Sequence, residues 1–229
     1  MKFEILPVTR FEQNCSILWC EATNKAAIID PGGEVGLILD YLSLLELEPQ
    51  VILVTHGHFD HAGGAAELAA ATGTRIEGPH RGDEHLIQRL AQAGERYRTS
   101  ARSYAPDRWL DGGERIRFGE EILEVLHCPG HTRGHVAYFH AAGRVAFVGD
   151  ILFRHTIGAW EHPDGDLRTL VHSIRAKLFP LGDDVRFVPG HGEMSTFGHE
   201  RIASPFVGDA AMAKWTRGIP EVGDPAAHL

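Results

Sequence analysis

The sequence is poor in cysteine. Only Cys15, Cys20 and Cys128 occur in 229 residues, and this odd number, at these spacings, fits neither a disulfide framework nor a CxxC metal site. We therefore expect three small buried thiols in a reducing compartment. A chain of this length buries a substantial core without disulfides, so we expect one domain over residues 1–210 and a carboxy-terminal tail over 211–229.

Long apolar runs are also missing. No stretch approaches the ~20 consecutive apolar residues that a membrane-spanning helix needs. The first residues, MKFEILPVTRFEQN, contain no apolar core of the length found in a signal peptide. We therefore expect a cytoplasmic protein without a membrane partner.

Basic residues are fewer than acidic ones. The 22 lysines and arginines against 31 aspartates and glutamates give a formal net charge of -9. Non-specific affinity for nucleic acid comes mainly from basic side chains that neutralise phosphates, so this balance argues against a nucleic-acid partner. The 15 histidines, in contrast, exceed what core packing requires. Their positions are the main evidence on function.

Apolar periodicity predicts a mixture of strands and helices, and hence an α/β (α+β) protein. The expected strands lie at residues 3–8, 15–20, 26–30, 51–55, 122–128, 135–140, 144–150 and 185–190, and the expected helices at 34–48, 63–73 and 164–179. The polar, arginine-rich segment 79–114 is typical of a helix and a long loop, inserted between two sheet-forming halves.

The stretch THGHFDH, residues 55–61, follows the apolar run VILV and holds four metal-binding side chains. In an extended or turning backbone, residues two apart point to the same side, so His56 and His58 can converge on one point. Asp60 and His61 then turn towards a second point. The spacing makes two adjacent metal sites geometrically reasonable.

Three more candidates each follow an apolar strand and stand beside glycine. They are His131 in CPGHTRGH, Asp150 in VAFVGD and His191 in VRFVPGHG. Imidazole and carboxylate suit zinc, iron or manganese, and a bridging carboxylate such as Asp150 holds two cations together in dinuclear hydrolases. The residues therefore predict a metal centre assembled from distant strand ends.

The motifs HxHxDH, PGHTxGH, GD and PGHG, in this order, resemble the signature of the metallo-β-lactamase superfamily. Within it, the chain is most similar to short, single-domain glyoxalase II (hydroxyacylglutathione hydrolase)-like proteins. The similarity rests also on PVTRFEQNCSILWC, AIIDPGG, APDRWLDGGE and PGHGEMSTFGHER, and it covers residues 1–207. It implies a four-layer αββα sandwich, with the metals at one edge of two packed sheets.

The resemblance also implies a role for each donor. It assigns the first metal to His56, His58 and His131, the second to Asp60, His61 and His191, and the bridging position to Asp150. Two divalent ions follow, with zinc as the first expectation and iron or manganese as alternatives. The activity implied is hydrolysis of a small-molecule thioester such as S-lactoylglutathione by a metal-bridging hydroxide. Asp60 and Asp150 then serve catalysis as well as metal binding.

Substrate recognition departs from the family pattern. Where relatives carry a Gly-Arg or Gly-Lys pair that resembles a carboxylate clamp, this chain has Ala159, Trp160 and Glu161. Arg133 and Arg154 are the candidate replacements, because guanidinium binds carboxylates in a bidentate fork.

The other histidines lack convergent spacing. His135 is expected to pack or to support the ligands, and the remaining nine are expected at the surface or in structural roles. These nine are His80, His85, His127, His140, His155, His162, His172, His199 and His228.

Three alternative functions stay open. A persulfide dioxygenase of this fold needs only one iron, held by residues such as His56, His131 and Asp150, so the second donor set argues against it. A hydrolase of another ester or of a lactam has the same ligands. A metal-binding module without catalysis typically lacks ligands, and here all seven are present. The oligomeric state is not predicted.

Overall fold

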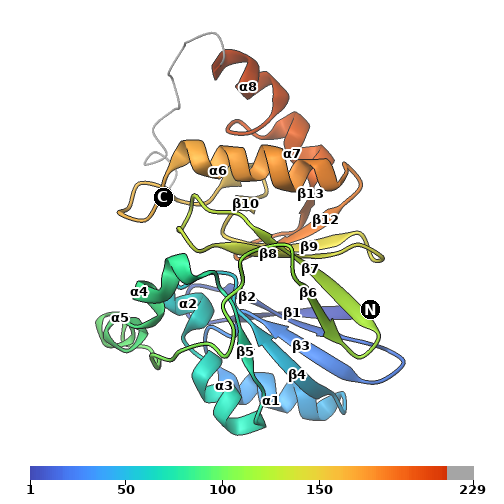
Figure 1. Cartoon of the computed structure of the whole chain (residues 1–229), viewed down its shortest axis with the longest axis vertical. Coiled ribbons are helices and arrows are strands. Elements are labelled where there is room, and N and C mark those ends of the chain that lie inside the picture. The colour runs from blue at the N-terminus through green and yellow to red at the C-terminus, as the bar shows by residue number, and fades with distance from the viewer. Residues whose placement is uncertain (216–229) are drawn as a thin grey trace.

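Two β-sheets face each other and carry helices on their outer sides, as Figure 1 shows for this computed structural model. The structure describes residues 1–215. The first sheet has the order β1-β2-β3-β4-β5 and the second the order β13-β12-β9-β8-β7-β6. Helices α1 and α3 cover the first sheet, and α6 and α7 cover the second. The predicted αββα sandwich is confirmed.

The first sheet comes from the amino-terminal half. Its strands are β1 (Lys2–Val8), β2 (Gln13–Trp19), β3 (Lys25–Ile29), β4 (Glu48–Leu53) and β5 (Ile76–Glu77). The first three strands pair antiparallel, whereas β3, β4 and β5 are parallel. Helices α1 (Val35–Leu44) and α3 (Ala65–Thr72) follow β3 and β4. Because parallel strands need a crossover, these helices return the chain across one face of the sheet.

The second sheet comes from the carboxy-terminal half. Its strands are β6 (Arg115–Phe118), β7 (Glu121–His127), β8 (Val136–His140), β9 (Val145–Gly149), β12 (Arg186–Pro189) and β13 (Ser195–Thr196). Every residue of β8 and β9 is buried, as expected for central strands covered on both faces. A short hairpin of two strands with two residues each, β10 (Leu152–Phe153) and β11 (Thr156–Ile157), lies outside both sheets.

The remaining helices surround this framework. They are α2 (Phe59–Ala62), α4 (Glu84–Ile87), α5 (Leu90–Tyr97), α6 (Leu167–Ser173), α7 (Phe197–Ala203) and α8 (Asp209–Trp215), with a π-helical turn over Ile174–Leu178 and 3₁₀ turns over Arg81–Asp83 and Phe179–Leu181. Helix α8 crosses the boundary expected after residue 210. The rest of the expected tail, 216–229, lies outside the described residues.

Aromatic and aliphatic side chains from both sheets fill the space between them. The cluster includes Leu53 from the first sheet and Phe118, Tyr138 and Phe147 from the second. Phe3 packs edge-on against Phe147, with ring centroids 5.5 Å apart. Since burial of large apolar side chains is the main favourable term in folding, this layer fixes the two sheets together and so fixes the relative position of their strand ends.

The segment 79–114 contains more helix than the single one expected. It forms the 3₁₀ turn, α4 and α5, followed by an irregular stretch. Tyr97 at the end of α5 stacks on Phe59 of α2, with ring centroids 4.4 Å apart and planes 8° from parallel. The insertion is therefore packed against the helix that begins within THGHFDH. In the described part of the chain, no helix is long and apolar enough to cross a bilayer.

Candidate metal centre

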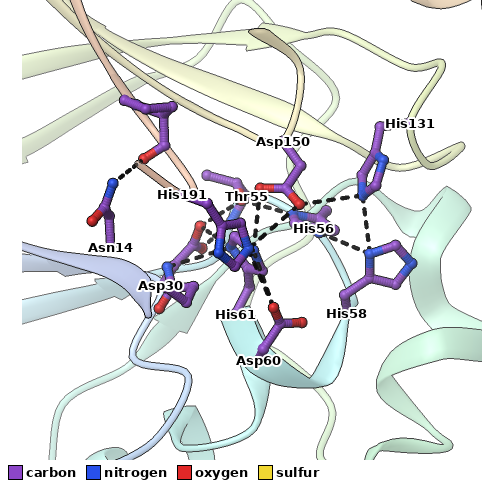
Figure 2. Close-up of polar contacts among 12 residues, drawn as sticks. Asn14, Asp30, Thr55, His56, His58, Asp60, His61, His131, Asp150 and His191 are labelled. Carbon is purple, nitrogen blue, oxygen red and sulfur yellow. Dashed lines mark hydrogen bonds and ion pairs between the residues drawn. The ribbon is translucent and has the colours of Figure 1, made fainter. Parts of the chain in front are cut away.

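All seven predicted donors lie at one edge of the sandwich, at the ends of strands and in the loops that follow them (Figure 2). Strand β4 ends at Leu53, and the chain then passes through His56 and His58 into α2, where Asp60 and His61 occupy the first turn. The other three follow β7, β9 and β12. Strand ends held by a packed core make a rigid base for such a site.

The first donor set consists of His56, His58 and His131. The Nδ1 atom of His58 lies 3.1 Å from Nε2 of His56 and 3.0 Å from Nε2 of His131. In the described residues these three form one of the groups whose ligand atoms all lie within 4.8 Å of one another. Three imidazole nitrogens converging at this spacing match the geometry of a metal site.

The second set consists of Asp60, His61 and His191. Nε2 of His191 lies 3.3 Å from both Nε2 of His61 and Oδ2 of Asp60. Asp150 lies between the two sets, because its Oδ1 is 3.3 Å from Nε2 of His61 and its Oδ2 is 3.7 Å from Nε2 of His131. The carboxylate is thus placed where it can contact an ion in either set.

Hydrogen bonds on the outer side of the rings fix which nitrogen faces inward. Nδ1–H of His131 donates to the carbonyl oxygen of Ala159 at 2.7 Å, and Nδ1–H of His191 donates to that of Phe11 at 3.0 Å. Nδ1–H of His61 donates to Oδ2 of Asp30 at 2.9 Å. A neutral imidazole with one nitrogen donating has its lone pair on the other. Each Nε2 therefore faces the centre as a ligand atom.

His56 is oriented in the same way through a hydroxyl group. Thr55 donates its hydroxyl to Oδ2 of Asp30 at 2.6 Å, and its Oγ1 lies 3.0 Å from Nδ1 of His56. Since the hydroxyl proton is already donated to Asp30, Oγ1 accepts the Nδ1–H of His56. The Nε2 lone pair of His56 then faces the centre.

The first donor set is electrically neutral near neutral pH. Burial and the neighbouring histidines hold the pKa of His56 well below its usual range. Burial and His131 lower the pKa of His58 to about 3, and burial lowers the pKa of His131. Burial disfavours an imidazolium because the charged form loses its hydration. These rings are thus held unprotonated, the form that binds metal.

The second donor set lies among carboxylates, which favour positive charge on its histidines. Burial opposes the charged form of His61, but the carboxylates of Asp150 and Asp60 outweigh it and raise the pKa of His61 well above its usual value. Burial likewise opposes the ionised form of Asp150, yet His61 and His131 lower the pKa of Asp150. The centre therefore concentrates negative charge that attracts cations.

The donors present fit divalent metal ions. Oδ1 of Asp150 is shielded from solvent and accepts no hydrogen bond from any residue the structure describes. A buried carboxylate oxygen without a donor is costly unless a cation satisfies it. His56, His58 and His131 would hold one ion, and Asp60, His61 and His191 the other, with Asp150 shared.

Three supporting residues escaped sequence reasoning. Asp30 accepts from His61 and Thr55, as described above. Asp83 accepts from the Gly57 amide at 2.9 Å and the Thr132 hydroxyl at 2.7 Å, so it ties together the two loops that carry the first donor set. Gln13 is fully buried, with its amide nitrogen 3.4 Å from Nδ1 of His61. Asp83 lies in none of the motifs quoted above, and Asp30 and Gln13 lie in AIIDPGG and PVTRFEQNCSILWC, which supported the resemblance but assigned neither residue a role.

His135 supports the centre as expected. Its ring stacks on His56 with centroids 4.5 Å apart, and its Nε2 accepts a hydrogen bond from the Asp150 amide at 3.1 Å. Nδ1–H donates to the carbonyl oxygen of Val136 at 3.0 Å. Both ring nitrogens are occupied, so His135 holds the backbone of Asp150 in place.

The residues considered for substrate binding each contact other parts of the chain. Arg133 is exposed and pairs with Asp164 at 3.3 Å, and Arg154 pairs with Glu193. The carbonyl of Ala159 orients His131, and Glu161 accepts from the Trp160 amide at 3.2 Å. The Trp160 ring packs against Phe206. The contact of Ala159 with His131 thus places the segment 159–161 next to the first donor set.

Three known proteins are similar to this chain over most of its length. Hydroxyacylglutathione hydrolase GloC of Haemophilus influenzae is 42% identical over 209 residues, which make up 90% of this chain and 98% of that protein. The solved structure of the B3 metallo-β-lactamase BLEG-1 has a TM-score of 0.83 at 29% identity and covers 90% of this chain and 99% of its own. TTHA1623, solved in a di-iron-bound form, has a TM-score of 0.80 at 32% identity, with coverage of 89% and 99%.

The family model described as Metallo-beta-lactamase superfamily matches residues 8–191. This range runs from the last residue of β1 to His191, so it takes in strands β2 to β12 and every one of the seven convergent donors. By the match, the fold and the donor set together, the chain belongs to the metallo-β-lactamase superfamily.

Proposed function

We propose that this protein is a dinuclear metallohydrolase that cleaves a small-molecule acyl thioester in the cytoplasm. The observation that carries the proposal is the position of Asp150 between two complete donor sets, with a distance of 3.3 Å to His61 and 3.7 Å to His131. The thioester class is supported by the 42% identity to an enzyme named for hydroxyacylglutathione hydrolysis. S-Lactoylglutathione is the first substrate to test.

Bound divalent ions would supply an acidified water molecule as nucleophile and would polarise the substrate carbonyl. Zinc is our first assignment, with iron or manganese as alternatives, because the donor set contains imidazoles and carboxylates and no thiolate. Asp60 stays ionised: burial raises the pKa of its carboxyl, but His61 and the close contact with His191 more than offset this. Its carboxylate can therefore accept a hydrogen bond from the attacking water and orient it.

No serine or cysteine nucleophile is needed. Cys128 is fully buried, and burial raises the pKa of its thiol to about 12. Thiolate is the reactive form of cysteine, so a thiol with this pKa is inert near neutral pH. The chemistry is then carried by the donor centre.

Lactam hydrolysis is the second candidate, because BLEG-1, named as a B3 metallo-β-lactamase, shares the fold at a TM-score of 0.83. A β-lactam and a thioester both present a carbonyl to the same centre. A mononuclear iron enzyme acting on a persulfide is disfavoured by the presence of Asp60, His61 and His191, which a single-ion site would not use.

A substrate panel on protein of measured metal content tests the proposal. Wild-type turnover is measured on four substrates: S-lactoylglutathione, a second acyl thioester, glutathione persulfide and a β-lactam. Oxygen consumption is followed for the persulfide. His58→Ala and Asp150→Ala should lose both bound metal and turnover, whereas His172→Ala, an exposed histidine of α6, should keep both. Absence of thioester turnover across the panel, or full activity in the two site variants, would reject the proposal.

A further inference from the structure

His162 lies against the first donor set, although no motif or spacing in the sequence predicts a place for it there. Its ring centroid is 5.3 Å from that of His131 and 5.5 Å from that of His58, and both pairs meet edge to face. Its Nε2 atom is shielded from solvent and has no hydrogen-bond partner within residues 1–215. A buried imidazole nitrogen in this position needs a partner that the chain itself does not provide.

His162 is not one of the metal ligands. The convergent group of the first set contains His56, His58 and His131, and none of the ligand groups found in the described residues includes His162. The ring is therefore next to the ligands without converging on the same point. Its missing partner is better sought in a molecule that binds over the first donor set.

The loop that carries His162 is held in place. Asp164 lies 3.0 Å from Nε2 of His85 on α4 and 3.3 Å from Nε of Arg133, so it is anchored to two other segments. The Gly165 amide donates to the carbonyl of His162 at 2.9 Å, which closes a tight turn. Since the turn is fixed before any ligand arrives, His162 is preorganised and little ordering is needed on binding.

We propose that His162 is a catalytic residue whose Nε2–H donates a hydrogen bond to the carbonyl oxygen of the acyl group. The inference rests on the proposed function, because it takes an acyl compound as the substrate. Its location beside His58 and His131 puts it next to the first donor set, and an ion held there would polarise the substrate carbonyl. The hydrogen bond strengthens as negative charge develops on that oxygen, so it lowers the barrier more than it tightens substrate binding. No proton is transferred.

Kinetics of three variants test this role on the metal-loaded protein. His162→Ala should lower kcat by about 10²-fold with KM changed by less than about threefold, because an interaction made mainly in the transition state is lost. His162→Gln, whose amide can still donate, should recover part of the loss. His172→Gln makes the same chemical change at an exposed position of α6 and should match wild type.

Two measurements besides turnover separate this role from others. Metal content and the midpoint of thermal unfolding should be the same in wild type and His162→Ala. Loss of metal would make His162 a ligand, and a fall in thermal stability with equal losses in His162→Ala and His162→Gln would make it structural. Either of these two results would overturn the proposal. An effect of His162→Ala on KM alone, or an unchanged kcat, would overturn it as well.

The test also works if the thioester assignment fails. When wild type cleaves an ester or a β-lactam but no thioester, the proposed function is wrong, and the His162 variants are assayed on the substrate that is cleaved. When nothing is cleaved, calorimetry with a trifluoromethyl ketone analogue of the lactoyl thioester replaces kinetics, because its hydrate mimics the tetrahedral state. Binding at least about tenfold weaker in His162→Ala would support the role, and equal binding would reject it.

Discussion

Asp30 and His61 form a buried pair in which Oδ2 of the carboxylate accepts the Nδ1–H of the imidazole at 2.9 Å. The same carboxylate accepts the amide and the hydroxyl of Thr55, at 2.7 Å and 2.6 Å. Thr55 in turn accepts from His56. One carboxylate at the end of β3 therefore orients a histidine in each donor set, directly in the second and through a hydroxyl in the first.

Asp30→Asn should weaken metal binding without removing any predicted ligand. The asparagine offers one carbonyl oxygen where the carboxylate offered two charged ones, so His61 loses a strong acceptor and its basicity falls. Loss of such an outer partner typically costs about 10- to 100-fold in metal affinity, and competition titration with a chelator measures it. Asp40→Asn, at an exposed position of α1, is the matched control. Equal metal affinity in both variants would contradict the role of Asp30.

The seven donors were predictable because each follows an apolar strand and stands in a short motif that can be read locally. Asp30 also follows an apolar strand, but its partner His61 lies 31 residues further along the chain. Only the parallel pairing of β3 with β4 brings them together. A lone aspartate before proline and glycine reads equally well as a turn residue. Supporting contacts of this kind depend on the fold and are not visible in the motif.

The fold was predictable in part for similar reasons. Strands of five or more residues such as β8 and β9 carry a clear apolar pattern, but β10 and β13 contain two residues each and have no periodicity to detect. The αββα arrangement itself came from the family resemblance, since the strand pattern alone is compatible with other mixed folds. His162 was missed because its place beside His131 results from the loop before α6, not from spacing.

Gly190→Ala should weaken metal binding, because the added methyl group would displace metal-binding side chains. A methyl group at this position would lie 2.0 Å from Oδ1 of Asp150 and 2.6 Å from Cε1 of His61, so either the carboxylate or the ring must move. We expect a loss of at least about tenfold in metal affinity, comparable to loss of an outer partner of a ligand. Metal content after dialysis against a chelator provides the measurement.

Gly36→Ala is the control for that substitution. Gly36 lies in α1, and a methyl group there would meet no atom within 4 Å. Alanine favours a helix over glycine by up to about 1 kcal/mol, so the free energy of unfolding should stay the same or rise, with metal content unchanged. Similar metal loss in both variants would show that the effect of Gly190→Ala is not specific to its contacts with Asp150 and His61.

His127 should make the protein less stable in mild acid. Burial lowers the pKa of His127, and His80, stacked on it with ring centroids 4.1 Å apart, adds to the effect. Its folded pKa is thus below the unfolded value of about 6.5, so as the pH falls through that value the unfolded chain takes up a proton that the folded chain does not. The contribution to stability is present at higher pH and is lost on acidification.

Urea unfolding at about pH 7.5 and pH 5.5, at constant metal content, checks this sign. The decrease in unfolding free energy between the two pH values should be smaller in His127→Gln than in wild type, because the variant has no imidazole to titrate. His172→Gln removes an exposed imidazole and should behave as wild type. An equal decrease in His127→Gln and wild type would refute the assignment.

Arg133 and Arg154 should discriminate between charged and neutral thioesters. Arg154 pairs with exposed Glu193, two residues after His191, and Arg133, two residues after His131, pairs with Asp164. If either arginine leaves its acidic partner to bind a substrate carboxylate, the loss in folding free energy is small, because exposed ion pairs contribute only about 0–1 kcal/mol. Either arginine can therefore turn to a bound carboxylate without a large loss of stability.

Arg133→Ala and Arg154→Ala should raise KM for S-lactoylglutathione by about three- to tenfold, the range expected for loss of one partly exposed charged hydrogen bond. KM for a neutral N-acetylcysteamine thioester should change little. Arg117→Ala removes the same charge from an exposed position of β6 and so controls for the effect of net charge on KM. An equal rise in KM for both thioesters would argue against carboxylate recognition. If Arg133→Ala instead lowers kcat for both thioesters, the ion pair of Arg133 with Asp164 acts by positioning His162. Comparison of the charged and the neutral thioester therefore separates recognition of the carboxylate from support of the loop that carries His162.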